Sequence, residues 1–196
     1  MFQREEEPQR KEEAQPFSSY HGKEMSEQEF EALIEQKEVR YEYVHGRAYV
    51  LEPESEKHNR LLFCVANLID LHLAESFCRV GIVDKYVQVG EKSRLLPDVV
   101  VTCSYTNEMK RFEAWTVVEI LSRYTERLDR GEKFAAYTRL PSLQEYVLVH
   151  QDQQLIEVYR RADNWQPRIL GPGEQVELVN RRVSFSVNEV YSVLTP

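Results

Sequence analysis

The sequence predicts a single-domain α/β protein with one hydrophobic core. Its 196 residues suit one domain of ordinary size, and a hydrophobic content of 42% supplies enough apolar side chains for that core. Leu95–Thr102 and Ala114–Leu121 are rich in Val, Leu and Ile and are typical of strands buried on both faces. A long helix with one apolar stripe precedes them, so strands and helices share the same chain segment.

The N-terminal part is predicted to be a charged tail followed by a short helix. Residues 1–24 hold few aliphatic side chains and many Glu, Gln, Arg and Lys, which is typical of a flexible tail or a solvated helix. Ser26 and Glu29 form a capping-box pattern just before an apolar run. We therefore expect the folded domain to cover residues 25–196.

A hairpin and the longest helix are predicted next. Arg40–Val44 and Arg47–Leu51 are rich in β-forming residues and flank a His-Gly pair, which predicts two strands joined by a tight turn. Ser55 is placed to begin a helix. The apolar stripe of that helix recurs at three- and four-residue spacing and consists of Leu61, Leu62, Val65, Leu68, Ile69, His72 and Leu73.

The middle of the chain is predicted to form strands. Arg79–Val89 alternates weakly and predicts one strand, and a turn at residues 90–93 follows it. The two aliphatic runs then form the buried strands. Between them lies a polar loop around Asn107, which we expect to be the most mobile segment.

A helix is predicted after the second aliphatic run, with two possible starts. It begins either after Thr125, or at Asp129 as cap with Glu132 as box partner, and the sequence leaves both open. Asp129, Lys133 and Tyr137 lie in one column of this helix. The remaining predicted elements are strands over Leu143–His150 and Gln154–Arg160, short strands near Val176 and Val183, and a helical turn or two over residues 187–194.

Composition limits the classes of function and the location. A formal net charge of −8 argues against a protein that coats nucleic acid non-specifically, although an enzyme with a local basic channel remains compatible with it. The three cysteines, Cys64, Cys78 and Cys103, show no Cys-x-x-Cys spacing, which favours buried free thiols in a reducing cytoplasm. The charged N-terminus is not typical of a signal peptide, and no stretch is apolar enough to span a membrane.

Two acidic residues interrupt the aliphatic runs. Asp98 and Glu119 each lie within a predicted buried strand, where a carboxylate is costly unless it is paired or binds a cation. If the strands are neighbours, the two carboxylates suit Mg²⁺, which prefers oxygen ligands. Lys133 would add a fixed positive charge near a reacting phosphate. The alternative is structural: Asp98 caps a strand, and Glu119 pairs with Arg123 or Lys133.

Glu42 and His58 are secondary candidates. Glu42 lies in the predicted hairpin and is either a further acidic ligand or an exposed strand glutamate. His58 lies at the start of the long helix, where it either touches a phosphate or acts as a base, or has no function. The histidines do not show a metal-binding spacing such as His-Glu-x-x-His.

Five short motifs in this order resemble the Uma2 family, a family of restriction-endonuclease-like proteins similar in fold to the PD-(D/E)XK nucleases. The resemblance covers about residues 25–194. Its motifs are Tyr41-Glu42-Tyr43-Val44-His45-Gly46, Ser55-x-x-His58, Leu96-Pro97-Asp98-Val99-Val100-Val101, Val118-Glu119-Ile120-Leu121-Ser122 and Asp129-Arg130-Gly131-Glu132-Lys133-Phe134-Ala135-x-Tyr137.

The resemblance implies a fold and a set of site residues. It implies a restriction-endonuclease-like fold: a central mixed β-sheet flanked by helices, with a preceding hairpin and extra C-terminal strands. It also implies that Asp98 and Glu119 are the metal-binding acids and that the backbone carbonyl of Ile120 is a further ligand. Leu121 stands where the nuclease pattern has lysine, and Lys133 on the next helix matches the Uma2-like replacement.

The expected activity is hydrolysis of DNA phosphodiester bonds with Mg²⁺ or Mn²⁺. Asp98 and Glu119 would hold the metal, Lys133 would stabilise the transition state, and Glu42 would assist. The rival is a catalytically inactive binding module for nucleic acid or protein that keeps the fold. We further expect a cytoplasmic protein that does not bind membranes, and a possible homodimer by analogy with nucleases that cut both strands.

Overall fold

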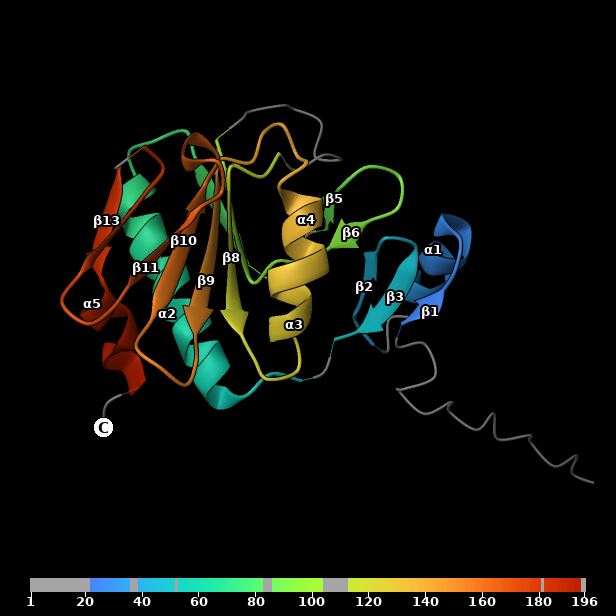
Figure 1. Ribbon diagram of the computed structural model, residues 1–196, viewed down its shortest axis with the longest axis horizontal. Helices are drawn as coiled ribbons and strands as arrows, with labels where there is room; N and C mark the ends of the chain where they lie inside the picture. Colours follow the sequence, from blue (N-terminus) through green and yellow to red (C-terminus); the bar gives the residue numbers. More distant parts are fainter. Residues whose placement is uncertain are drawn as a thin grey trace, which may run out of the picture.

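A computed structural model describes residues 22–35, 39–51, 53–82, 86–103, 113–180 and 182–194. Its centre is a six-stranded mixed sheet with the strand order β11-β10-β9-β8-β7-β4 (Figure 1). Only β8 and β9 are parallel, and the other neighbours are antiparallel. The strands are β4 (Arg79–Ile82), β7 (Val99–Thr102), β8 (Thr116–Leu121), β9 (Glu145–His150), β10 (Ile156–Arg160) and β11 (Pro167–Leu170). The predicted mixed sheet is confirmed, although the sequence did not reveal β11.

Helix α2 (Glu56–Leu73) covers one face of this sheet (Figure 1). The side chain of Ser55 caps it by accepting a hydrogen bond from the His58 N–H, as the sequence predicted. Its apolar stripe packs against alternate residues of β7, β8 and β9 in the largest hydrophobic cluster. The same layer contains β12 (Gln175–Leu178), β13 (Val183–Ser186), α5 (Val187–Tyr191) and a 3₁₀ turn at Ser192–Leu194.

The opposite face of the sheet is covered by one continuous helical segment. It consists of α3 (Glu126–Leu128), a π-helical turn (Asp129–Lys133) and α4 (Phe134–Tyr137). The start after Thr125 is therefore correct, and Asp129 is not a cap because its backbone is helical. Tyr137 at the end of α4 and Tyr146 on β9 are fully buried in the hydrophobic cluster between this segment and the sheet. A π-helical turn is rare and often marks a functional site.

A smaller sheet, ordered β1-β3-β2-β6-β5, lies beside this helical segment (Figure 1). Its centre is the predicted hairpin, whose His45 and Gly46 both have positive φ, as the tight turn requires. Helix α1 (Glu27–Glu35) packs on it, and Ser26 and Glu29 form the predicted reciprocal cap. The strands are β1 (Lys23–Glu24), β2 (Tyr41–Val44), β3 (Arg47–Val50), β5 (Val87–Gln88) and β6 (Arg94–Leu95).

Two predicted strands are each divided between the two sheets, which corrects the sequence interpretation. Leu95–Thr102 separates into β6, which pairs with β2, and β7, which pairs with β8. Pro97 lies at the break, because proline cannot donate a hydrogen bond to a strand ladder. Arg79–Val89 likewise separates into β4 and β5. Asp98 therefore lies at the entrance of β7 and not within an unbroken strand.

Two residues of the predicted tail are part of the folded structure. Lys23 and Glu24 form β1, which is antiparallel to β3 with Lys23 opposite Ala48. The rest of the predicted tail, residues 1–21, lies outside the described residues, as does the predicted mobile loop around Asn107.

Cys78 and Cys103 form a disulfide, so the prediction of free thiols is wrong for these two residues. Arg79 of β4 lies opposite Thr102 of β7, and this register brings the flanking cysteines together with a Cα–Cα distance of 4.1 Å. Their separation of 25 residues concealed this pairing in the sequence. Cys64 is free and partly buried. Such pairs are rare in the reducing cytosol, so the cytoplasmic location stays a prediction.

In the part of the chain that the structure describes, no helix is both long and apolar enough to cross a membrane.

Candidate functional site

The sheet brings Asp98 and Glu119 together. Val99 pairs with Val118 across β7 and β8, and this register places Asp98 beside Glu119. The Asp98 N–H donates to Glu119 Oε2 at 3.4 Å, and the Ile120 N–H donates to Asp98 Oδ2 at 2.7 Å. Because the N–H and C=O of one strand residue face the same neighbouring strand, the Ile120 carbonyl faces this side as well. The sequence predicted this neighbourhood correctly.

Lys133 lies below these acids and is only 3% exposed. Its Nζ is 2.8 Å from Glu119 Oε1, 3.0 Å from Asp129 Oδ1 and 3.2 Å from Glu42 Oε1. The pairing of Glu119 with Lys133, which the structural alternative predicted, is present. Arg123 is exposed and makes no ion pair with any described residue.

Glu42 reaches the same lysine from the other sheet. It lies on β2 and is 1% exposed, so the alternative of an exposed strand glutamate is wrong. Its Oε1 accepts a hydrogen bond of 2.7 Å from the Leu96 N–H. This contact lies just before Pro97, at the break between β6 and β7. Glu42 therefore connects the hairpin to both Lys133 and the strand entrance.

Asp129 completes the surroundings of Lys133, and the sequence did not assign it a role. It is fully buried in the π-helical turn, one position of the column that also holds Lys133. The four-residue spacing from Lys133 was the feature of the sequence that could have indicated a contact, but spacing does not show whether Asp129 is buried. The Asp129 carboxylate faces Lys133, whereas the Tyr137 hydroxyl, although buried nearby on the same helical segment, has no hydrogen-bond partner among the described groups.

His58 is buried next to Asp98. Its Nε2 is 3.3 Å from Asp98 Oδ2 and 3.8 Å from Glu54 Oε2. Burial lowers the pKa of His58, but the hydrogen bond and charge of Asp98, together with the charge of Glu54, outweigh it and raise the pKa above its ordinary value. Nδ1 is buried without a hydrogen-bond partner among the described residues. His58 thus lines the same cavity as Asp98 from the start of the helix.

The cluster around Lys133 contains more negative than positive groups. Burial raises the pKa of Glu119 well above its ordinary value; Lys133 opposes this rise, and Asp129, Asp98 and Glu42 add to it. Burial also raises the pKa of Glu42. Conversely, the three carboxylates raise the pKa of Lys133 even though burial lowers it. The ammonium of Lys133 therefore stays charged, but its single positive charge does not balance the carboxylates around it.

A small cavity of about 50 Å³ joins these groups. Its charged and titratable lining residues are Arg40, Glu54, His58, Asp98, Glu119, Asp129 and Lys133. A wider hollow of about 690 Å³ lies near His45 and Glu91, but none of its charged lining residues is buried. The buried charged side chains therefore lie around the small cavity and not around the wider hollow.

Residues 27–187 match the family described as "Uma2: Putative restriction endonuclease". The chain belongs to the Uma2 family. It is 32% identical over 174 residues to an uncharacterized protein of Synechocystis sp., covering 85% of this chain and 91% of that protein. A second uncharacterized Synechocystis protein is 26% identical over 152 residues, covering 73% of this chain and 86% of that protein.

A solved structure supports the fold of this Uma2 protein. It is described as a putative nuclease belonging to DUF820 from Anabaena variabilis, and it superposes with a TM-score of 0.69 at 17% sequence identity. The match covers 81% of this chain and 93% of that chain. At this identity the likeness shows that the two chains share a fold but assigns no role to any residue.

Asp98 and Glu119 are the residues best placed to hold a metal in this Uma2 protein. Among the described residues, no three or more His, Cys, Asp or Glu side chains are placed to hold an ion by themselves. Two carboxylates with one carbonyl nevertheless fit Mg²⁺, because this ion usually keeps several waters and takes one or two protein carboxylates. Glu119 Oε1 is buried without a hydrogen bond among the described groups and lies 2.8 Å from Lys133 Nζ, so a bound cation would compete with this ammonium for the oxygen.

Proposed function

We propose that this Uma2 protein is a Mg²⁺-dependent nuclease that hydrolyses phosphodiester bonds of DNA. The observation that carries the proposal is the buried cluster in which Glu42, Glu119 and Asp129 surround one lysine next to Asp98. Buried charges without compensation are costly and are found mainly where function requires them. A divalent cation would compensate the excess of negative charge.

Asp98, Glu119 and the Ile120 carbonyl would hold that ion. When bound, Mg²⁺ or Mn²⁺ would polarise the phosphodiester and lower the pKa of a bound water. The hydrogen bond from the Ile120 N–H fixes one oxygen of Asp98, and His58 contacts that same oxygen. The carboxylate is therefore oriented before any ligand arrives.

Lys133 would stabilise the negative charge that develops on the phosphate. Its ammonium is fixed by Asp129 from its own helical segment and by Glu42 from the hairpin. Both contacts would persist if Glu119 turned toward the metal. Glu42 thus assists by positioning Lys133 and not as a direct partner of Asp98.

The rival function is a binding module that retains the fold without turnover. It is favoured by the acidic net charge of −8 and by the nearly complete burial of Lys133 behind carboxylates. Such a module would need neither the metal nor Asp98 to bind its partner.

Nicking of supercoiled plasmid separates the two functions. With Mg²⁺ or Mn²⁺ the wild-type protein should nick DNA, and EDTA should abolish the reaction. Asp98→Ala should lower the rate by about 10²-fold or more, the order seen when a preorganised electrostatic group is removed. Asp70→Ala, at an exposed aspartate of α2, is the matched control and should leave the rate unchanged. Equal rates for wild type and Asp98→Ala would refute the nuclease proposal.

The possible homodimer stays a prediction. Light scattering of the full chain at several concentrations measures it directly, and a monomer that still cuts both strands would remove the need for pairing.

A further inference from the structure

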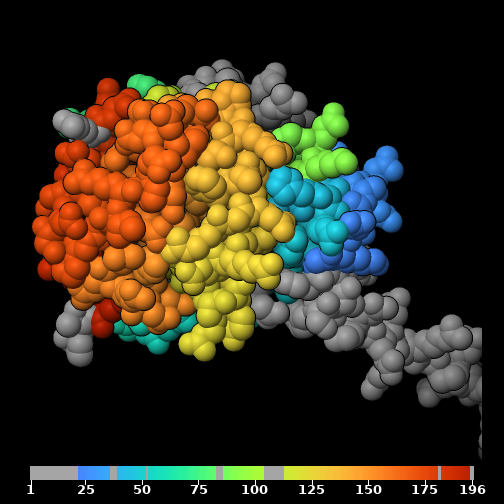
Figure 2. Space-filling model, viewed as in Figure 1, coloured from blue at the N-terminus to red at the C-terminus, as the bar shows by residue number. Residues whose placement is uncertain are grey.

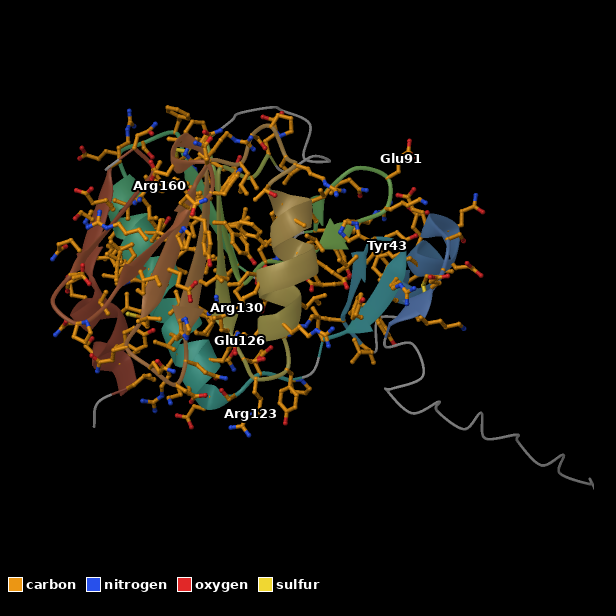
Figure 3. All side chains as sticks on the ribbon, in the orientation of Figure 1. Tyr43, Glu91, Arg123, Glu126, Arg130 and Arg160 are labelled. Atoms are coloured by element: carbon orange, nitrogen blue, oxygen red, sulfur yellow. A yellow bond between two sulfur atoms is a disulfide. The ribbon has the colours of Figure 1, made fainter. Side chains whose placement is uncertain are left out.

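The turn between β8 and α3 presents an unusual set of exposed side chains. Tyr124 is 80% exposed, and its neighbours Arg123 and Arg127 are exposed as well. Figure 3 shows Arg123 pointing away from the body of the protein at the end of β8. Within the described part of the chain, neither arginine forms an ion pair, and the Tyr124 ring has no aromatic partner. Among the described residues, therefore, no ion pair or ring contact competes with a ligand for these side chains.

The turn itself is ordered and not a loose loop. Ser122 is buried, and its hydroxyl accepts hydrogen bonds from the N–H groups of Tyr124 and Thr125 at 3.3 and 3.2 Å. Its carbonyl accepts the Glu126 N–H at 2.9 Å. The backbone that carries Arg123 and Tyr124 is thus held in one conformation, which lowers the entropic cost of binding through them.

This turn adjoins the mouth of the candidate site. Thr125 lines the same cavity as Asp98 and Lys133. The Asp98 side chain is 17% exposed, whereas Lys133 lies deeper. Arg40, just before β2, lines the cavity from the other sheet, is exposed and forms no ion pair among the described residues. Figure 2 shows the two parts side by side on the surface, α3 in yellow and the hairpin in cyan. We call Arg40, Arg123, Tyr124 and Arg127 the rim.

The chemistry of the rim fits a nucleic-acid strand. Arginines contact phosphates, and an exposed aromatic ring stacks on a base that is not already paired in a duplex. Free arginines beside an acidic cavity, in a chain with a net charge of −8, would attract phosphate to a place that otherwise repels it.

We propose that the rim binds single-stranded DNA, with Tyr124 stacking on an unpaired base and the three arginines contacting the flanking phosphates. This inference rests on the proposed nuclease function and specifies its substrate as an unpaired stretch of DNA.

Other basic residues near the cavity favour a single strand over a duplex. Arg60 pairs with Glu56, Lys57 with Asp152, and Arg130 with Glu126 and Glu157, so these three are already occupied. Duplex-binding proteins commonly make about six to ten phosphate contacts. The rim offers a few arginines and one aromatic platform, which is the combination that single-strand binding uses.

Fluorescence anisotropy tests the proposal with the full chain in EDTA, so that no cleavage occurs. The probes are fluorescein-labelled oligo(dT) of 12 nucleotides and its duplex with oligo(dA). The wild type should bind the single strand more tightly. Tyr124→Ala should weaken that binding by about fivefold or more, and Tyr124→Phe, which keeps the ring, should remain within about twofold of wild type.

Replacing Arg40, Arg123 and Arg127 together by alanine should make the salt dependence less steep. Each phosphate contact to a single strand contributes about −0.7 to the slope of log K against log salt, so the slope should fall by about 2 in magnitude. Arg168→Ala and Phe77→Ala are matched controls, because both residues are exposed elsewhere in the structure. Their thermal midpoints and binding should equal those of wild type.

The proposal fails if Tyr124→Ala binds the single strand as tightly as wild type, if the duplex binds more tightly, or if the controls lose as much affinity as the rim variants. Cleavage of the labelled single strand and nicking of plasmid, both measured with Mg²⁺ on the same samples, keep the two proposals distinct. Metal-dependent nicking with rim variants that bind normally would overturn the rim alone. Rim-dependent strand binding without cleavage of either DNA would overturn the nuclease function and support the rim as a binding surface.

Discussion

Arg130 and Lys133 lie three positions apart in the same π-helical turn, yet their surroundings differ completely. Arg130 is about a third exposed, and its guanidinium bonds Glu126 and both oxygens of Glu157. Glu157 also binds His150 and the Tyr159 hydroxyl. Although burial opposes it, the hydrogen bond from Arg130, with those from His150 and Tyr159, lowers the pKa of Glu157 to about 2. Figure 3 shows Glu126 and Arg130 on this helical segment.

Lys133 faces inward, where its one ammonium group lies within ion-pair distance of three carboxylates. Glu119 Oε1 and Asp129 Oδ1 lie at ion-pair distance from it but have no hydrogen bond among the described groups. The pKa of Glu119 moves up and not down, chiefly because of burial. The difference teaches that the number of ion pairs does not identify a functional site. An excess of buried charge of one sign is the better reason to propose one, because folding alone would favour a balanced or apolar cluster.

The largest difference between the two clusters is expected when the cation of each, Lys133 or Arg130, is replaced by alanine. Lys133→Ala leaves three buried carboxylates without the cation that they share and should lower the free energy of unfolding by about 3–5 kcal/mol at neutral pH. Arg130→Ala should cost only about 1 kcal/mol, because its site is partly exposed and Glu157 keeps two other partners. Urea unfolding measures both. Similar losses for the two variants would contradict the distinction.

A divalent metal ion should stabilise the folded protein through the cluster around Lys133 and not through the cluster around Arg130. A divalent ion that binds the folded site alone adds about 2.7 kcal/mol at a hundredfold excess over Kd. For a chain of this length each kcal/mol raises the thermal midpoint by about 2–4 °C, so Mg²⁺ or Mn²⁺ should raise it by several degrees.

Two variants serve as controls for the metal response. Asp98→Asn should lose most of the shift, whereas Glu157→Gln should retain it. A flat response of the wild type to millimolar metal would count against a metal site at Asp98 and Glu119.

The two clusters should also respond to pH in opposite directions. The raised pKa of Glu119 means that the folded protein binds its proton more readily than the unfolded chain does. The resulting stability is present at low pH and is lost as pH rises above the ordinary value of 4.5. The lowered pKa of Glu157 gives stability that is present above pH 4.5 and is lost as pH falls toward about 2.

Unfolding free energies measured between pH 2 and 8 would show both declines in stability, one on the acid side and one on the alkaline side. Glu119→Gln should flatten the decline on the alkaline side, and Glu157→Gln should flatten the decline on the acid side. If either substitution flattened the opposite limb, the assignment of the two clusters would be wrong.

The smallest effect is expected at the exposed end of the Arg130 cluster. Glu126 and Arg130 form an i, i+4 pair of 2.9 Å with both side chains partly exposed. Glu126→Gln should therefore change the unfolding free energy by only about 0.3–0.5 kcal/mol, and this difference should shrink in high salt. A loss comparable to that of Lys133→Ala would mean that the outer cluster is as important as the inner one.

Local patterns in the sequence were sufficient for several elements. The caps at Ser26 and Ser55, the hairpin turn at His45-Gly46 and the aliphatic run of β8 depend on neighbouring residues, and each lies where it was predicted. Asp98 and Glu119 were also recognisable, because a carboxylate in an aliphatic run conflicts with its surroundings.

Contacts between distant segments were decided only by the tertiary structure. The division of Leu95–Thr102 between two sheets, the Cys78–Cys103 pair and the contact of Glu42 with Lys133 each depend on elements that lie far apart in the sequence. The sequence shows which residues are charged, but packing of the hairpin and the π-helical turn against β8 decides which charges are buried together. Burial removes the solvent that would otherwise screen those charges, and that is what distinguishes Lys133 from Arg130.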